Sequence, residues 1–295
     1  MVQQLSIPEP GDALWSAIIE KFGAVTSVTM AGRSQSTFIL HTPGGKLVAK
    51  RMRYDRDPEH YFELLTSLAE MSSRFCPRLL DTVAAQNCWY AFFEWISGDC
   101  LPFLPSDADF IWRSTLLLLG RMRTCSFLPK WPLESIWLDR LAKQMSNDAA
   151  AAFILASLRC SVPDGPRLLT HGDFSLQNFI RSSDGVVLVD WEEVGSAPPG
   201  FDAGWMLALA RLGYGPPQSH DEMVDAFVDA GLSKSNLSWF ETLGLLRLLF
   251  RARTLPMTPD HRLLVLPLVQ QTVYTRATEM GWQNDSNSPL SAQQS

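Results

Sequence analysis

The hydrophobic pattern of this 295-residue chain changes near Ile96, and this change restricts the fold more than any other feature of the sequence. Before Ile96, short segments alternate between apolar and polar residues or are rich in β-branched residues, which is typical of strands. They cover residues 27–30, 36–41, 46–52, 79–84 and 88–95, and helical spacing covers residues 12–22 and 57–71. Pro43-Gly44-Gly45 predicts a hairpin turn between the second and third strands. We therefore expect a small antiparallel sheet accompanied by two helices.

After Ile96, most segments have the spacing of amphipathic helices. These predicted helices cover residues 107–124, 133–145, 148–160, 202–211, 221–230, 237–253 and 262–280. Short strand-like runs interrupt them at residues 165–169, 179–181 and 186–190. The pattern predicts an α+β protein with an N-terminal lobe of residues 1–95 and a larger, mostly helical C-terminal lobe of residues 96–280. The polar residues 281–295 are predicted to form a disordered tail.

The composition excludes several classes of protein. The chain has 46% hydrophobic and 19% charged residues, which suits a globular protein with a large core. Its net charge is -6, and acidic residues lie close to its densest group of basic residues. Both features argue against a nucleic-acid-binding protein. The five cysteines form no CxxC pair, so we expect them to be reduced. Neither a signal peptide nor a membrane span is indicated, and we expect a soluble, cytoplasmic protein of undetermined oligomeric state.

One motif suggests chemistry. Residues 171–179 read HGDFSLQNF, and a hairpin of strands after Asn178 ends in VDWEE. Such a hairpin would bring Asp173, Asn178 and Asp190 to one edge. Their oxygen atoms are ligands that Mg²⁺ prefers, and a carboxylate can also accept a proton. Any one of these residues could merely cap a turn, but the whole set predicts a metal and phosphate site.

The motif HxDxxxxN, followed by an apolar strand ending in Asp-Trp-Glu, resembles the aminoglycoside phosphotransferase and choline kinase family of protein-kinase-like enzymes. The resemblance covers residues 25–205 and implies a bilobal kinase-like fold. It implies that Asp173 orients the acceptor hydroxyl and accepts its proton, and that Asn178 and Asp190 bind Mg²⁺. His171 and Asp202 would then support the loop structurally.

The resemblance places the nucleotide site on the first lobe. Val48 and Lys50 share one face of a strand because their positions differ by two. Val48 would cover the adenine and Lys50 would reach the α and β phosphates. Glu63 is the expected acidic partner of Lys50, with Glu59 as the alternative.

Two further segments would contact the nucleotide. The turn Ala31–Ser36 would cover the phosphates with its backbone N–H groups and with the hydroxyls of Ser34 and Ser36. The segment Glu94–Ile96 would form the hinge, and its backbone groups would bind adenine. The sequence departs from the family at Ala197, after Asp202 and near Gly120, all in the lobe that shapes the acceptor site.

We therefore expect an ATP- and Mg²⁺-dependent kinase, with GTP as another possible donor, that phosphorylates a hydroxyl of a small molecule. Candidate acceptors are an antibiotic, an amino sugar, an amino alcohol or a natural-product intermediate. From Trp95 onward the chain has 21 acidic and 16 basic residues, and this excess of negative charge slightly favours a cationic acceptor. Arg247, Arg251 and Arg253 point instead to an anionic or nucleotide-like acceptor. Because they are spaced by four and by two residues, they cannot all face one site. A pseudokinase that only binds nucleotide is the alternative function, and a protein kinase is disfavoured because no Asp-Phe-Gly motif is present.

Overall fold

The computed structural model describes residues 13–31, 36–52, 58–70, 75–85, 88–100, 108–126, 128–183, 185–214, 216, 218–254 and 259–283. The chain forms two compact units. The first contains Met1–Pro102, Gly120–Pro129 and Leu176–Val194, and the second contains Phe103–Leu119, Lys130–Ser175 and Gly195–Ser295. Ser34 and most of the predicted tail lie outside the described residues. Among the described helices, none combines the length and apolar character needed to cross a bilayer.

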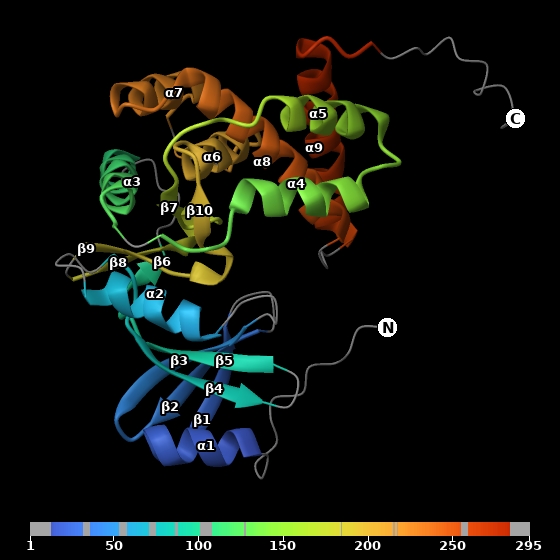
Figure 1. Ribbon diagram of the computed structural model, residues 1–295. Helices are drawn as coiled ribbons and strands as arrows, with labels where there is room; N and C mark the ends of the chain where they lie inside the picture. The colour runs from blue at the N-terminus through green and yellow to red at the C-terminus, as the bar shows by residue number, and fades with distance from the viewer. Residues whose placement is uncertain are drawn as a thin grey trace, which may run out of the picture. The chain divides into compact units, whose positions relative to one another are not determined.

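The first unit is built on an antiparallel sheet in the order β1-β2-β3-β5-β4 (Figure 1). Its strands are β1 (Ser27–Ala31), β2 (Thr37–Thr42), β3 (Gly45–Met52), β4 (Leu79–Ala85) and β5 (Cys88–Glu94). A tight turn joins β2 to β3, where Thr42 Oγ1 donates to the Gly45 carbonyl oxygen over 3.0 Å. The predicted antiparallel sheet and its hairpin are therefore confirmed.

Two helices cover this sheet, α1 (Ala13–Phe22) and α2 (Pro58–Glu70), and they lie on opposite sides of it in Figure 1. Trp15 and Ile18 of α1 pack in one cluster with Ala49 of β3. Because side chains alternate along a strand, Lys50 is directed to the face opposite Ala49. Tyr61 of α2 packs edge-on against Trp89, with ring centroids 5.3 Å apart.

A second, smaller sheet of the first unit has the order β6-β8-β9. It consists of β6 (Asp99–Cys100), β8 (Phe179–Ser182) and β9 (Gly185–Leu188), and the last two form the predicted hairpin. Leu188 N donates to the Phe75 carbonyl oxygen over 2.8 Å, and the Trp191 ring lies 5.9 Å from the Phe75 ring. These contacts explain why Leu176–Val194 groups with the first unit, whereas the predicted division placed it with the C-terminal lobe.

The second unit is mostly helical. It includes α3 (Ala108–Arg123, of which residues 120–123 group with the first unit), α4 (Leu133–Gln144), α5 (Ala149–Cys160), α6 (Phe201–Arg211), α7 (His220–Asp229), α8 (Lys234–Thr254) and α9 (Pro259–Glu279). The predicted helices in this part of the chain are confirmed within a few residues at their ends. Strand β7 (Leu168–Thr170) pairs antiparallel with β10 (Gly195–Ala197), which the sequence pattern did not predict.

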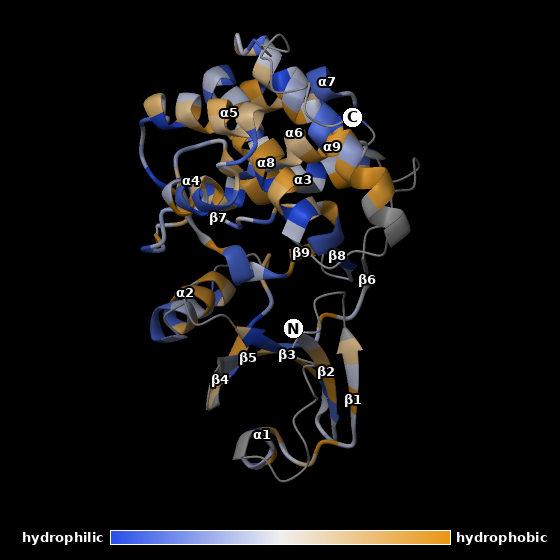
Figure 2. Ribbon diagram, turned by 90° about the vertical axis from the view of Figure 1, so that its right-hand side faces the viewer, coloured by the Kyte–Doolittle hydropathy of each residue, from blue (hydrophilic) through white to orange (hydrophobic). Residues whose placement is uncertain are grey.

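The core of the second unit draws on α4, α5, α6, α8 and α9, and Figure 2 shows hydrophobic residues along α8 and the helices around it. Helices α6 and α8 approach closely at two glycines. A Cβ atom on Gly204 would lie 2.5 Å from the Phe240 Cβ, and one on Gly244 would lie 2.8 Å from the Ala208 Cβ. Only glycine permits this distance between the helices, and the contact fixes the position of α8.

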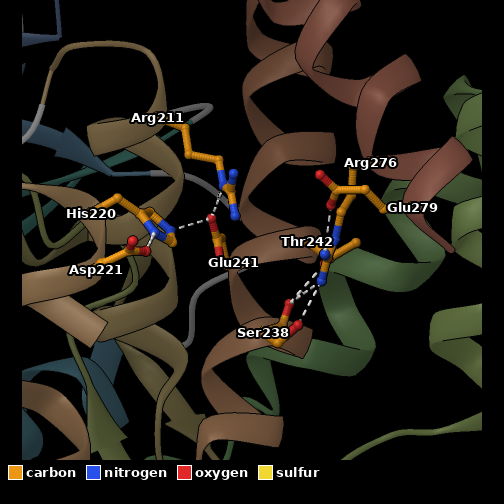
Figure 3. Close-up of polar contacts among 8 residues, drawn as sticks. All are labelled: Arg211, His220, Asp221, Ser238, Glu241, Thr242, Arg276 and Glu279. Carbon is orange, nitrogen blue, oxygen red and sulfur yellow. Dashed lines mark hydrogen bonds and ion pairs between the residues drawn. The ribbon is translucent and has the colours of Figure 1, made fainter. Parts of the chain in front are cut away.

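Buried polar contacts hold α8 on two sides (Figure 3). Glu241 is only 4% exposed, and it pairs with Arg211 of α6 and with Nε2 of His220 at the start of α7, the latter at 2.8 Å. On the α9 side, Arg276 donates to Ser238 Oγ over 2.5 Å and to Thr242 Oγ1 over 2.9 Å. These contacts fix α8, which also carries the arginines described below.

Candidate active site

Lys50 lies on β3 with its side chain 7% exposed, and it forms two ion pairs within the first unit. Its ammonium contacts Asp190 directly and lies 2.9 Å from Glu192 Oε2. Burial alone would lower the pKa of this lysine, but the carboxylates of Asp190 and Glu192 raise it above its usual value. Lys50 therefore remains a cation at neutral pH, next to two acidic side chains.

These two ion pairs of Lys50 do not involve Glu63, the partner expected from the resemblance. Glu63 lies on α2 with an exposed side chain, and Lys50 pairs instead with Asp190 and Glu192. The sequence contained one signal for Glu192. When a turn begins at an aspartate such as Asp190, the residue two positions later can lie on the same side of the chain as that aspartate. That signal depends on the conformation of the turn, which the residue pattern does not reveal.

The turn that brings Glu192 back begins at Asp190. This residue has φ 68°, and it is the one non-glycine residue with positive φ in the described parts of the chain. Such a conformation is unfavourable for most residues, is tolerated by aspartate, and is often found at functional sites. A single 3₁₀ turn, Trp191–Glu193, follows it, and Trp191 Nε1 donates to the Leu188 carbonyl oxygen over 2.7 Å.

The β8–β9 hairpin places Asn178 at the same end as Asp190. Val189 N donates to the Asn178 carbonyl oxygen over 2.8 Å, which continues the pairing of Phe179 with Leu188 by one more step. Asn178 is 6% exposed, and the side chain of Asp190 is 41% exposed. The hairpin therefore presents amide and carboxylate oxygens at one end.

These oxygen atoms suit a magnesium ion. The described residues contain no group of three or more His, Cys, Asp or Glu side chains that could hold a metal unaided. Mg²⁺ typically binds one or two carboxylates together with phosphate oxygens and water, so a large protein cage is not required. Asp190, Glu192 and Asn178 supply hard oxygen donors, and Lys50 already shows that a cation is stable beside the two carboxylates.

The residues expected to contact adenine lie along β3 and β5. Val48 is half-buried and pairs with Phe93, and the preceding pair joins Leu47 to Glu94. Glu94 ends β5, where its Oε1 accepts from Arg78 N over 2.8 Å. Ile96, two residues further on, is half-buried.

The expected phosphate-covering turn is described in part. Ser36 is half-buried, and its carbonyl oxygen accepts a hydrogen bond from Arg51 N over 2.7 Å. Ser34 lies outside the described residues.

In the second unit, the HGD loop (His171, Gly172 and Asp173) follows β7 and is held by Asp202 of α6. Asp202 is 3% exposed, and its two carboxylate oxygens accept from His171 N over 2.8 Å and from Gly172 N over 2.9 Å. Burial raises the pKa of Asp202 above its usual value, although His171 and the two backbone donors oppose the rise. Inside the loop, Asp173 N donates to His171 Nδ1 over 3.2 Å, so the ring proton of a neutral His171 is on Nε2.

Two arginines of α8 contact the HGD loop, and the sequence pattern could not identify this contact. Arg247 Nη2 donates to the Gly172 carbonyl oxygen over 2.5 Å, and Arg251 Nη1 lies 3.0 Å from Asp173 Oδ1. Burial would raise the pKa of Asp173, but the charges of Arg251 and Arg247 hold it below its usual value. Arg253 is directed elsewhere and pairs with Asp148 at 2.6 Å.

The chain is similar in sequence to known phosphotransferases. The sequence model of the phosphotransferase enzyme family matches residues 28–237 of the chain. Thiamine kinase from Salmonella heidelberg (strain SL476) is 24% identical over 236 residues, which cover 75% of this chain and 77% of the relative.

Two solved structures have the same fold. A thermostable mutant of aminoglycoside phosphotransferase APH(4)-Ia, in a ternary complex with ADP and hygromycin B, matches with a TM-score of 0.66 and 15% identity. The match covers 92% of this chain and 99% of that one. Choline kinase LicA from Streptococcus pneumoniae matches with a TM-score of 0.65 and 15% identity, covering 90% and 96% of the two chains.

At these identities the structural likeness establishes the fold, and the predicted α+β fold of the protein-kinase type is confirmed. The family model covers well over half of the sequence and includes the HGD loop, the β8–β9 hairpin and Lys50. The resemblance stated from the sequence motifs is thereby confirmed, and the chain belongs to the phosphotransferase enzyme family.

Proposed function

We propose that this phosphotransferase is an ATP- and Mg²⁺-dependent kinase that phosphorylates a hydroxyl group of a small molecule. The observation that carries the proposal is the charge cluster of Lys50, Asp190 and Glu192 beside Asn178. A buried lysine and several oxygen donors are what a metal-bound polyphosphate requires, because it carries both negative charge and a divalent ion.

In the nucleotide site, Lys50 would donate hydrogen bonds to the α and β phosphates. Asn178 and Asp190, assisted by Glu192, would hold the metal ion, which when bound neutralises the charge of the phosphates. Val48 would pack on the adenine, and the backbone groups of Glu94–Ile96 would bind its edge. Ser36, and Ser34 in the same turn, would contact the phosphates from above.

In the acceptor site, Asp173 would accept a hydrogen bond from the acceptor hydroxyl and orient it toward the γ-phosphorus atom. The lowered pKa of Asp173 keeps the carboxylate ionised at neutral pH, where it is able to accept this bond. A weak base is sufficient because phosphoryl transfer passes through a loose transition state, in which the proton leaves late. Asp202 and His171 would hold the loop in the conformation that this requires.

The charge of the acceptor is a separate question. The excess of acidic residues from Trp95 onward, 21 against 16, leans toward a cationic acceptor. Thiamine kinase and choline kinase are named for cationic acceptors, which favours the same class of acceptor. Both arguments are general, whereas the acceptor must approach the particular residues around Asp173.

A phosphorylation screen tests the proposal. Purified protein is incubated with γ-labelled ATP or GTP, with and without Mg²⁺, and with a panel of alcohols, amino alcohols, sugars, hydroxy acids and aminoglycosides. We expect Mg²⁺-dependent transfer of label to at least one acceptor, and we expect ATP to be the preferred donor.

The screen also separates the proposal from the pseudokinase alternative. Binding of Mg-nucleotide with neither transfer to any acceptor nor slow hydrolysis would favour a pseudokinase. Failure to bind nucleotide would contradict both functions.

A further inference from the structure

Helix α8 presents two guanidinium groups to the loop that carries the proposed proton acceptor. Arg247 and Arg251 are four residues apart, so they lie on one face of the helix. Arg247 contacts the Gly172 carbonyl oxygen at 2.5 Å, and Arg251 lies 3.0 Å from Asp173 Oδ1. Successive turns of one helix therefore contact successive residues of the HGD loop.

Arg247 is buried in the core, where its role is structural. It is 1% exposed, and its Cζ atom lies 4.4 Å from the ring centroid of Trp137 and 4.3 Å from that of Trp205. Contacts of a cation with aromatic faces at this distance are favourable, more so when they are shielded from water. Arg247 therefore contributes a permanent positive charge behind the loop.

Arg251 lies closer to solvent. Its side chain is 22% exposed and that of Asp173 is 15% exposed, so this ion pair remains partly accessible. The Cζ atom of Arg251 lies 4.9 Å from the Trp205 ring centroid, and this contact restricts the position of the guanidinium group. A molecule that reaches Asp173 therefore also reaches a held guanidinium group.

This arrangement determines which charges can be accepted near the reacting hydroxyl. A hydroxyl that donates to Asp173 must lie about 2.6–3.2 Å from a carboxylate oxygen. Substituents on the neighbouring carbon atoms then lie within a few ångströms of Arg251. A planar guanidinium group binds carboxylates and phosphates through paired hydrogen bonds, whereas it repels an ammonium group. The negative charge of Asp173 is already compensated by Arg251, so it offers little attraction to a cation.

We propose that Arg251 is a specificity-determining residue that selects alcohols with a carboxylate or phosphate close to the hydroxyl and disfavours cationic alcohols. The inference rests on the proposed function and specifies its substrate class.

In the reaction, the acceptor oxygen forms a bond to the γ-phosphorus atom as the bond between that atom and the β–γ bridging oxygen breaks. The hydroxyl proton passes to Asp173 and then to water, and the nucleoside diphosphate leaves.

A series of three-carbon alcohols tests the proposal with little change in shape. Glycerate carries a carboxylate, glycerol 3-phosphate carries a phosphate and glycerol is neutral, while choline provides the cationic arm. We expect the wild-type protein to phosphorylate at least one of the two anionic alcohols with a kcat/KM at least about tenfold above that for glycerol, and choline least of all. The two anionic arms show whether a carboxylate or a phosphate is preferred.

Variants of Arg251 connect the preference to this residue. In Arg251→Gln we expect KM for the preferred anionic alcohol to rise about 10- to 100-fold, with a much smaller change for glycerol. Arg251→Lys should retain part of the preference, because it keeps the charge and loses the paired geometry. Arg253→Gln is the matched control, since it removes an arginine of the same helix whose partner is Asp148, and it should keep the wild-type preference.

A binding measurement covers the case in which none of these alcohols is turned over. With Mg-ADP present, glycerate or glycerol 3-phosphate should raise the unfolding temperature of the wild type and of Arg253→Gln, but not of Arg251→Gln. A wild-type protein that prefers choline or glycerol, or that shows no shift with either anion, would overturn the assignment of Arg251. Absence of transfer to every acceptor, together with absence of nucleotide binding, would instead refute the proposed kinase function.

Discussion

Lys50 and Asp190 are 140 residues apart in the sequence and form an ion pair in the first unit. Their contact joins the five-stranded sheet to the β8–β9 hairpin. Glu192 forms a second ion pair with Lys50, whose Nζ lies 2.9 Å from Glu192 Oε2. The pairing places a cation where the phosphates and the metal ion of a nucleotide would have to be accommodated.

Replacing Lys50 should weaken nucleotide binding. In Lys50→Met, we expect the affinity for Mg-ATP to fall at least about tenfold, because a charge-assisted hydrogen bond is worth about 1.5–3 kcal/mol. Titration calorimetry measures the change. Lys21→Met is the control, since Lys21 pairs with Asp81 on the same unit and is 40% exposed. An unchanged affinity in Lys50→Met would show that Lys50 does not contact the phosphates.

Arg251 should set the acid limit of activity through Asp173. The carboxylate must be ionised to accept a proton, and Arg251 holds its pKa below the usual value of 3.8 against the effect of burial. Removing the guanidinium group raises that pKa, so activity should be lost at a higher pH as the solution is acidified. The measurement is kcat/KM for a neutral acceptor across the acidic range, in Arg251→Gln and in Arg253→Gln. Superimposable acid limbs in the two variants would contradict the role of Arg251.

His220 should make stability depend on pH. The hydrogen bond to Glu241 raises the pKa of His220, and the contact with Asp221 raises it further (Figure 3). Burial and the charge of Arg211 lower it, but the net pKa is above the usual value of 6.5. A raised pKa means that the folded state binds the proton more tightly. The stabilisation is therefore complete below about pH 6.5, the unfolded value, and disappears as the pH rises through the folded pKa. Thermal unfolding of the wild type and of His220→Gln should differ by about 1–3 °C more at pH 6 than at pH 9. A difference that grows with pH would contradict the pairing.

Gly204 should resist replacement by alanine. Alanine normally favours a helix over glycine by about 1 kcal/mol, but here its Cβ would lie 2.5 Å from Phe240 Cβ and 2.6 Å from Glu241 N. We expect Gly204→Ala to destabilise the protein by about 1–3 kcal/mol. Gly120→Ala on α3 has no atom within 4 Å of the added Cβ, and it should be neutral or slightly stabilising. Equal effects of the two substitutions in thermal unfolding would argue against close packing of α6 on α8.

The sequence predicted the elements whose patterns are local. Alternation along β3 placed Val48 and Lys50 on one face, and the hairpin after Asn178 followed from two short apolar runs with a turn between them. Strand β10 was missed because three residues are too short to show a period, and its pairing with β7 depends on a distant part of the chain. The helix that carries Arg247 and Arg251 was predicted.

The partners of charged residues were harder to predict. Glu63 was expected to pair with Lys50, but Asp190 adopts a left-handed conformation and brings Glu192 to it instead. The spacing of Arg247, Arg251 and Arg253 showed that they could not all face one site. It could not show which two contact the HGD loop, because that depends on how α8 packs against α6.

The central claim is that Asp173 directs phosphoryl transfer to an acceptor hydroxyl while the first unit binds the nucleotide. The most direct test measures transfer of labelled phosphate and Mg-ATP affinity on the same preparation of Asp173→Asn. Asp139→Asn serves as the control, because Asp139 is 72% exposed and pairs with Arg159. We expect the turnover of Asp173→Asn to fall about 10²- to 10⁴-fold, while its Mg-ATP affinity stays within about twofold of the wild type. Turnover close to that of Asp139→Asn would contradict the account.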